Sequence, residues 1–324
     1  MLLFGGVLAG AAGPAALKLR PMAPPFNSPP PVTPVDVREP HDLASPLVFA
    51  SPHSGSYYPQ DFVAAAALDL ATLRKSEDCY VDELFGDAPA LGAPLVRALF
   101  PRAYLDVNRE PYELDPDMFD SPLPAHVNAG SARVAAGLGT IARIVASRRE
   151  IYRGKLAFAE AERRINDVYR PYHQAVRALV QRARDRFGFC LLIDCHSMPS
   201  TGLPLSMDSD MRTLDIVLGD RAGLSCHSAI TDTADETLTA LGYRVVRNNP
   251  YAGGFTTQHY GDPAGGIHVL QIEINRALYM DEISFARRPA FATLKSDLGR
   301  LMLRLQALAA GFAPELAYQR LSAE

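Results

Sequence analysis

Two histidines, His53 and His196, stand where apolar runs of the sequence end. Residues 47–50 precede His53, and residues 189–193 lead into the segment Asp194-Cys195-His196. Imidazole is a common zinc ligand, and catalytic zinc is typically held by three protein ligands with one position left for water. The pair therefore predicts a metal site. The alternative for each histidine taken alone is a hydrogen-bonded structural residue.

A third metal ligand is expected from the acidic stretch SEDCYVDE at residues 76–83. Its spacing leaves Glu77, Asp78 and Asp82 as alternatives. The competing interpretation is a helix N-terminus, with Ser76 as the N-cap and acidic residues in the first turn. The sequence alone does not choose among the three acids.

Glu273 lies inside the otherwise apolar run at residues 269–274. An ionised carboxylate in such a strand is costly unless it is paired, binds a metal ion or faces a cavity. The sequence contains no G-x-S-x-G nucleophile elbow, and none of its cysteines carries a nucleophile signature. The sequence thus gives no sign of a covalent nucleophile.

Asn108 and Arg109 follow a further apolar run at residues 104–107. A planar guanidinium binds a carboxylate through two parallel hydrogen bonds, so this pair favours an anionic amino-acid substrate. The alternative is a surface ion pair between Arg109 and Glu110 or Glu113.

A glycine-containing stretch, NPYAGGFTTQHYG, occupies residues 249–261. Its Gly253 and Gly254 permit a close approach of the backbone, and Tyr251 and Thr257 stand beside them. We expect these four residues to cover a bound substrate, and the alternative is a plain turn. The stretch is not a P-loop, because the required spacing and the Lys-Ser/Thr pair are missing.

The elements that position these residues alternate between short apolar strands and helical patterns. Strands are predicted at residues 47–50, 93–99, 104–107, 189–193, 243–246 and 268–274, and helices between residues 141 and 180 and at residues 290–308. Pro171 is expected to kink or break the first helical region. The alternation predicts a single α/β domain. Ligands of such sheets collect at the carboxyl ends of the strands.

Composition limits the class of protein. The 324 residues include 36 acidic and 32 basic side chains, for a formal net charge of −4. This balance argues against nucleic-acid binding, and the body lacks an apolar stretch long enough for a membrane protein. The 4 cysteines are irregularly spaced, which favours reduced thiols in the cytoplasm.

The proline-rich residues 1–35 are predicted to form a disordered extension before a catalytic domain at residues 36–324. Met22 is a candidate initiator. A cleaved export signal is the alternative, but no basic residue precedes the apolar part of the extension.

Several stretches, in one collinear order, resemble the N-formylglutamate amidohydrolase family. They are SPHSGSYYP (51–59), SEDCYVDELF (76–85), RAYLDVNREPYELDPDMF (102–119), YRPYH (169–173), LLIDCHSMP (191–199), NPYAGGFTTQHYG (249–261) and IHVLQIEINRALYMDE (267–282). The family is similar in turn to the zinc carboxypeptidase and aspartoacylase group. The resemblance therefore implies a zinc carboxypeptidase-like (phosphorylase/hydrolase-like) fold, with a mixed sheet flanked by helices.

The resemblance also implies one zinc ion per chain, with His53 and His196 as ligands. The wider group has a metal-binding acid three residues after the first histidine, where this chain has Ser56. The acidic ligand must therefore come from elsewhere in this chain, and we assign it to Asp78.

By the same resemblance, Glu273 is the catalytic base. Asn108 and Arg109 hold the substrate carboxylate, with Arg102 as a further arginine.

The implied reaction is zinc-dependent hydrolysis of N-formyl-L-glutamate, or of a close N-acyl amino acid, to formate and L-glutamate, a reaction of histidine degradation. One alternative is a zinc hydrolase of small peptides or other N-acyl amino acids. A second is a non-catalytic protein that binds acidic amino acids. In each case the expected partner is a small molecule, with no nucleic acid and no membrane. The sequence leaves the oligomeric state open.

Overall fold

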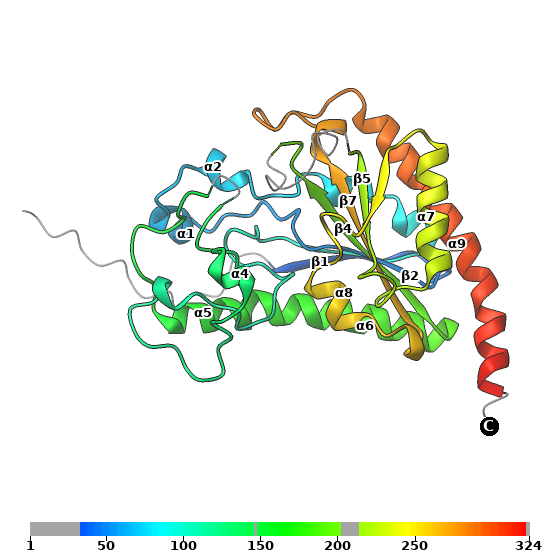
Figure 1. Cartoon of the computed structure of the whole chain (residues 1–324), viewed down its shortest axis with the longest axis horizontal. Coiled ribbons are helices and arrows are strands. Elements are labelled where there is room, and N and C mark those ends of the chain that lie inside the picture. Colours follow the sequence, from blue (N-terminus) through cyan, green and yellow to red (C-terminus); the bar gives the residue numbers. More distant parts are fainter. Residues whose placement is uncertain (1–32, 146–147, 202–213, 322–324) are drawn as a thin grey trace, which may run out of the picture.

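The computed structural model describes residues 33–145, 148–201 and 214–321, and its chain trace is shown in Figure 1. The described residues form a seven-stranded sheet in the order β1-β3-β2-β4-β7-β5-β6. The strands are β1 (Val35–Arg38), β2 (Leu47–Ser51), β3 (Leu95–Ala98), β4 (Cys190–Met198), β5 (Ile216–Gly219), β6 (Val245–Arg247) and β7 (Ile267–Asn275). Strands β3, β2, β4 and β7 are parallel, whereas β1 and β5 run antiparallel to β3 and β7. The predicted mixed α/β sheet is confirmed.

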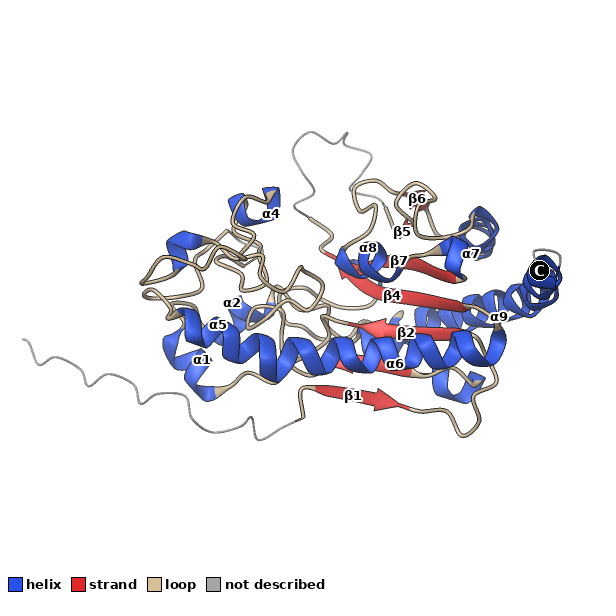
Figure 2. Ribbon diagram, turned by 90° about the horizontal axis from the view of Figure 1, so that it is seen from below, coloured by secondary structure: helices blue, strands red, loops and turns tan. Residues whose placement is uncertain are grey.

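Helices cover both faces of this sheet. The helices are α1 (Gln60–Ala65), α2 (Leu70–Arg74), α3 (Val81–Leu84), α4 (Ala132–Ala135), α5 (Phe158–Arg164), α6 (Arg170–Phe187), α7 (Ser228–Ala240), α8 (Phe255–Tyr260) and α9 (Phe291–Leu321). Helix α6 runs along one face of the sheet, and α8 packs against β7 (Figure 2). Helices α3, α7 and α9 form the layer on the other face, where α7 and α9 lie side by side (Figure 1).

Alternate residues of the central strands point into two separate cores. In β4, Leu191 and Ile193 pack into the core that includes α9, whereas Cys190 and Leu192 pack into the core that includes α6. Because both faces are covered, the strand is a continuous apolar run in the sequence. The same two-residue period directs His196 toward the α6 face.

The apolar run at residues 104–107 is not a strand, which corrects one prediction. The amides of Tyr104 and Leu105 donate to the carbonyl of Pro101 in a turn, and Asp106 N donates to Thr140 O. The run is apolar because it is buried, and its backbone hydrogen bonds are made outside the sheet. Conversely, β1 and β5 were not predicted; each has only 4 residues.

The predicted helical region at residues 141–180 begins later than expected and passes through Pro171. Residues 141–145 and 148–157 are irregular, and a π-helical turn at Ile165–Tyr169 joins α5 to α6. Arg170 N donates to Ile165 O, five residues back. Pro171, which has no N–H, is the second residue of α6, two residues after the end of this wider turn. The helix therefore does not break at Pro171, where a kink or a break was predicted, but the α-helical pattern is interrupted by the π-helical turn just before it.

The first strand bears on the predicted extension. β1 begins at Val35, so residue 35 belongs to the sheet, and Pro34 O just before it accepts from Leu99 N. The rest of the predicted extension, residues 1–32, lies outside the described residues. Within the described ranges, no helix is long and apolar enough to cross a membrane.

Candidate metal centre and substrate cavity

Three neighbouring parallel strands bring His53, His196 and Glu273 together. β2 pairs with β4, and β4 pairs with β7 in a register that sets His196 beside Glu273. His53 lies just beyond the end of β2, as predicted. His196 lies within β4, which continues to Met198, and so it does not follow the strand as expected.

His53, Asp78 and His196 form the candidate metal centre. All three are buried, and one ligand atom from each lies within 4.8 Å of the others. Asp78 Oδ2 is 3.0 Å from His196 Nδ1 and 3.5 Å from His53 Nδ1. Two imidazoles and a carboxylate are a donor set that suits zinc.

The other two candidate acids point elsewhere. Glu77 accepts from the Tyr58 hydroxyl at 2.7 Å and pairs with Arg74, whereas Asp82 pairs with Arg97 at 2.6 Å. The alternative of a helix N-terminus capped by Ser76 is also not found. Helix α2 is capped by Asp69, and α3 begins only at Val81. Among the alternatives, Asp78 is therefore the acid that faces the histidines.

A second carboxylate orients each imidazole. His53 Nε2 donates to Asp106 at 2.6 Å, and His196 Nε2 lies 3.1 Å from Asp194. The Nδ1 atoms of both rings are thus left toward Asp78. Carboxylates placed behind ligating histidines in this way fix the ring orientation at metal sites.

One ring nitrogen of the site has no hydrogen-bond partner. His53 Nδ1 is buried and makes no hydrogen bond to the described part of the chain. Burial raises the pKa of Asp78, but the neighbouring His196 and His53 hold it well below its usual value. An ionised acid beside an unpartnered buried nitrogen fits a bound cation.

A cavity of about 340 Å³ adjoins this centre. The residues that line it include Glu273, Arg102, Arg109, Arg276 and Lys75. Burial raises the pKa of Glu273 to about 7, since it disfavours the charged form and the nearby acids add to the effect. The cavity thus holds a carboxyl group that exchanges a proton near neutral pH among cations that attract carboxylates.

The cavity arginines differ in how many donors remain for a ligand. Arg102 donates through Nη2 to Asp106 at 2.8 Å, and its other nitrogens make no hydrogen bond to the described residues. Arg109 donates to the carbonyls of Leu138 and Asn108 at 3.0 and 2.8 Å. Arg102 therefore has more free donors than Arg109, the arginine that was predicted to bind the substrate carboxylate together with Asn108.

The Asn108 amide is engaged by protein groups. Its Oδ1 accepts from Thr256 N at 2.7 Å and from the Thr256 hydroxyl at 2.9 Å. Its Nδ2 lies 3.2 Å from Asp194 Oδ2 and 2.9 Å from His196 Nε2. Asn108 thus links the start of α8 to the metal centre.

Residues of the glycine-containing stretch occupy different places. Tyr251 lines the cavity, and burial raises the pKa of its hydroxyl to about 12. Gly254 lies against the Asn108 side chain, and Gly253 lies against the Thr257 side chain. Direct substrate contacts by Gly253, Gly254 and Thr257 stay predictions.

Comparison with known proteins identifies the family of this chain. The family model for N-formylglutamate amidohydrolase matches residues 45–280. The chain belongs to the N-formylglutamate amidohydrolase family. The N-formylglutamate deformylase of Pseudomonas putida is 31% identical over 245 residues, which are 75% of this chain and 84% of that protein. The protein of the same name from Pseudomonas aeruginosa is 31% identical over 240 residues, 73% and 83% of the two chains.

Solved structures are similar to this chain in fold. The crystal structure of N-formylglutamate amidohydrolase from Ralstonia eutropha JMP134 matches with a TM-score of 0.77 and 38% identity, covering 86% of this chain and 98% of that one. A gene product of Agrobacterium tumefaciens matches with a TM-score of 0.61 at 18% identity, covering 85% and 96%, and shares the fold. As a member of the N-formylglutamate amidohydrolase family, the chain is an amidohydrolase.

Three residues of the site in this family member were not predicted. Arg276 donates to Asp78 Oδ1 at 2.9 Å, and Asp106 and Asp194 hold the histidine rings. Asp194 could have been predicted from the sequence, because it lies two residues before His196 on the same strand and residues two apart on a strand share a face. Arg276 and Asp106 lie outside the strands, and no spacing in the sequence indicates them.

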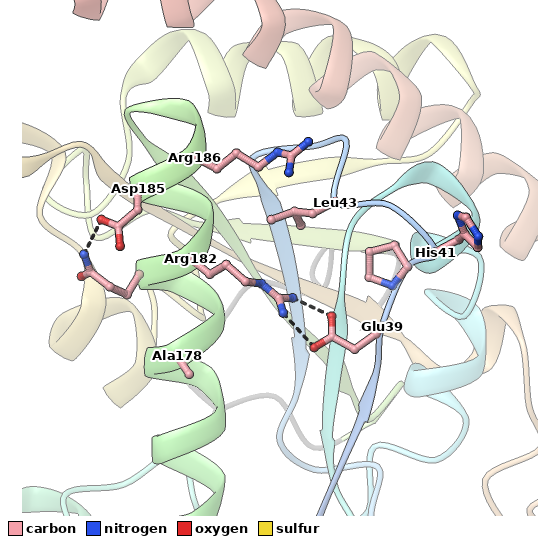
Figure 3. A pocket seen from close by; sticks show the side chains of 9 residues that line it. Glu39, His41, Leu43, Ala178, Arg182, Asp185 and Arg186 are labelled. Atoms are coloured by element: carbon pink, nitrogen blue, oxygen red, sulfur yellow. Dashed lines mark hydrogen bonds and ion pairs between the residues drawn. The ribbon is translucent and has the colours of Figure 1, made fainter.

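A larger hollow, of about 930 Å³, lies away from this site between α6 and the segment after β1 (Figure 3). Arg182 and Glu39 form an ion pair across it at 2.5 Å. In the described ranges, the group of acids, histidines and cysteines that could hold a metal ion is the one at His53. We therefore place the chemistry in the smaller cavity.

Proposed function

We propose that this amidohydrolase cleaves N-formyl-L-glutamate to formate and L-glutamate, with one zinc ion held by His53, Asp78 and His196. The observation that carries the proposal is the position of these three side chains beside a cavity that contains Glu273 and several guanidinium groups. A bound zinc ion would supply a water of lowered pKa and polarise the scissile carbonyl.

Glu273 is the proposed base. Its Oε1 accepts from Gln271 Nε2 at 3.0 Å, which leaves Oε2 to take the proton from the attacking water. A carboxyl group whose pKa is about 7 is half ionised at neutral pH. It can accept that proton and then deliver it to the leaving amine.

Arg102 and Arg109 are the proposed partners of the substrate carboxylates. N-formyl-L-glutamate carries two carboxylates, and the cavity has more than one cationic side chain to bind them. Binding both ends of the substrate would align its amide with the base and reduce the entropic cost of reaching the transition state. Tyr251 closes part of the cavity wall and is a proposed contact as well.

The test is a deformylase assay combined with metal analysis. We expect about one zinc per chain and release of equal amounts of formate and L-glutamate. A chelator should abolish the activity, and added zinc should restore it. His196→Ala should lose both metal and turnover. The matched control is His41→Ala, because His41 is exposed and pairs only with Asp42 in the described part of the chain.

A substrate panel separates the alternatives. N-formyl-L-glutamate is compared with N-acetyl-L-glutamate, N-formyl-L-aspartate and a dipeptide that ends in glutamate. Faster turnover of another member of the panel would reassign the substrate while keeping the metal chemistry. Tight binding of L-glutamate without metal and without turnover would overturn the proposal in favour of a binding protein.

A further inference from the structure

Residues 107–109, which carry the Asn108 and Arg109 side chains into the site, are held by groups from other elements. Val107 O accepts from His173 Nε2 at 2.8 Å, and Arg109 O accepts from the Tyr169 hydroxyl at 2.8 Å. Between them, Asn108 Oδ1 accepts from Thr256 N at 2.7 Å. Each residue of the segment thus has a partner 60 or more positions away in the chain.

These hydrogen bonds take the place of the backbone hydrogen bonds that a neighbouring strand would provide. The segment is not part of any strand in the described residues, so no neighbouring strand fixes its position. Tyr169 closes the π-helical turn before α6, and His173 lies four residues further on, on the same helical face. Their rings lie 4.2 Å apart. One face of a long helix therefore sets the position of the substrate-binding segment.

The contacts also fix the state of His173. A carbonyl only accepts, so Nε2 carries the proton that is donated to Val107 O, and Nδ1 accepts from the Tyr260 hydroxyl at 2.7 Å. Burial lowers the pKa of His173 to about 4, so the ring is neutral at pH 7. Both nitrogens are occupied, which leaves neither for a metal ion or a substrate proton.

His173 also connects α6 to α8, the helix that holds the Asn108 side chain. Tyr260 is the last residue of α8, and Thr256 near the start of that helix holds the Asn108 amide. Residues 107 and 108 are thus hydrogen-bonded to α6 and α8, and these two helices are hydrogen-bonded to each other through His173 and Tyr260.

We propose that His173 and Tyr169 are positioning residues that hold residues 107–109 so that Arg109 meets a carboxylate of the substrate. They would thereby set the preference for substrates that carry that carboxylate. This inference rests on the proposed function, because it assumes that Arg109 binds substrate.

The test compares His173→Phe, His173→Gln and Tyr169→Phe. Each is assayed with N-formyl-L-glutamate and with its two monoamides, in which one carboxylate or the other is uncharged. We expect His173→Phe and Tyr169→Phe each to raise KM for the diacid about tenfold, the effect of one lost hydrogen bond, with a smaller change in kcat. The monoamide that lacks the carboxylate bound by Arg109 should be affected much less. His173→Gln keeps a donor for Val107 O and should recover most of the loss.

The matched control is Tyr172→Phe on the same helix. The Tyr172 hydroxyl is buried and has no hydrogen-bond partner among the described residues. Its removal should leave the preference between the diacid and the monoamides unchanged. Zinc content should equal that of the wild type in every variant.

Two results would overturn the inference. One is an equal loss of kcat/KM for the diacid and both monoamides in His173→Phe and Tyr169→Phe, which is the pattern of general loosening. The other is an unchanged KM in both variants. If the wild type turns over no N-formyl amino acid, the proposed function fails, and L-glutamate affinity measured by calorimetry becomes the readout for the same variants. A wild type that also binds no L-glutamate would overturn both.

Discussion

Glu273 shows how one residue acquires its chemistry from its surroundings. It is 7% exposed and borders the cavity, so it is largely desolvated while it remains within reach of a ligand. Burial raises its pKa to about 7, whereas the nearby His196 and Arg102 favour the ionised form. The result is a carboxyl group suited to exchange a proton near neutral pH.

Glu273→Gln should retain zinc and lose turnover. The amide keeps the size of the side chain but cannot accept the proton, and loss of a general base typically lowers kcat by about 100-fold or more. Metal analysis and kcat measured on the same preparation check this prediction. Glu83→Gln is the control, because Glu83 pairs with Arg287 at the surface at 2.6 Å. A wild-type rate in Glu273→Gln would remove it as the base.

The cavity arginines are expected to act mainly on substrate binding. Arg102→Ala should raise KM by about 10- to 100-fold, the range for a charge-assisted hydrogen bond, with kcat less affected. Arg109→Ala should also raise KM. Arg102→Lys should recover little, because an ammonium group lacks the forked geometry of a guanidinium.

Steady-state kinetics on the diacid check these arginine variants. The control is Arg182→Ala, since Arg182 pairs with Glu39 in the hollow shown in Figure 3. An unchanged KM in both Arg102→Ala and Arg109→Ala would contradict the assignment of carboxylate binding to this cavity.

At the scale of elements, the start of α8 packs against the Asn108 side chain and so limits where its amide can lie. The backbone of Gly254, the residue before α8, is extended, a conformation open to any residue. A Cβ at this position would nevertheless lie 2.7 Å from Asn108 Nδ2 and 2.9 Å from its Oδ1. The requirement for glycine here is one of space.

Gly254→Ala should therefore displace the Asn108 amide and lower kcat/KM by about tenfold or more, the effect of about one disturbed hydrogen bond. Gly299→Ala in α9 is the matched control, because a Cβ there meets nothing within 4 Å. In that helix the change should raise the free energy of unfolding by about 0.5–1 kcal/mol. Kinetics and urea unfolding of both variants check the prediction. Unaltered kinetics in Gly254→Ala would show that α8 does not set the position of Asn108.

At the scale of the whole molecule, two buried histidines couple stability to pH. Burial lowers the pKa of both His173 and His268 to about 4, from an ordinary value of 6.5. Between these values the unfolded chain binds protons that the folded chain does not. The free energy of unfolding should therefore fall as the pH falls through this window.

Each histidine should contribute about 2 kcal/mol of this loss between pH 7 and pH 5. Urea unfolding at the two pH values, with chelator present, measures the total. The raised pKa of Glu273 acts in the opposite direction, so the comparison with His173→Gln isolates one histidine. This variant should lose less stability than the wild type on acidification. An equal loss in both would contradict the assignment.

The sequence by itself determined the central strands, the two metal-binding histidine candidates and the family. Strands β2 and β4 are covered on both faces, and each therefore contains a continuous apolar run in the sequence. Strand β7 is mostly apolar for the same reason. His53 and Glu273 could be predicted because a polar residue at the end of, or inside, such a run needs a reason to be there. The motifs that occur in one collinear order indicated the family.

Asp78 was assigned as the acidic ligand, although the spacing of the sequence left Glu77 and Asp82 as alternatives. The tertiary structure shows that Asp78 is the acid that faces the histidines, and it decides which side chains surround the cavity. Glu77, Asp78 and Asp82 are close in sequence, yet they diverge because their partners Tyr58, His196 and Arg97 come from different elements. The run at residues 104–107 was mistaken for a strand for the same reason: an apolar pattern records burial, whereas backbone and side-chain direction depend on distant hydrogen-bond partners.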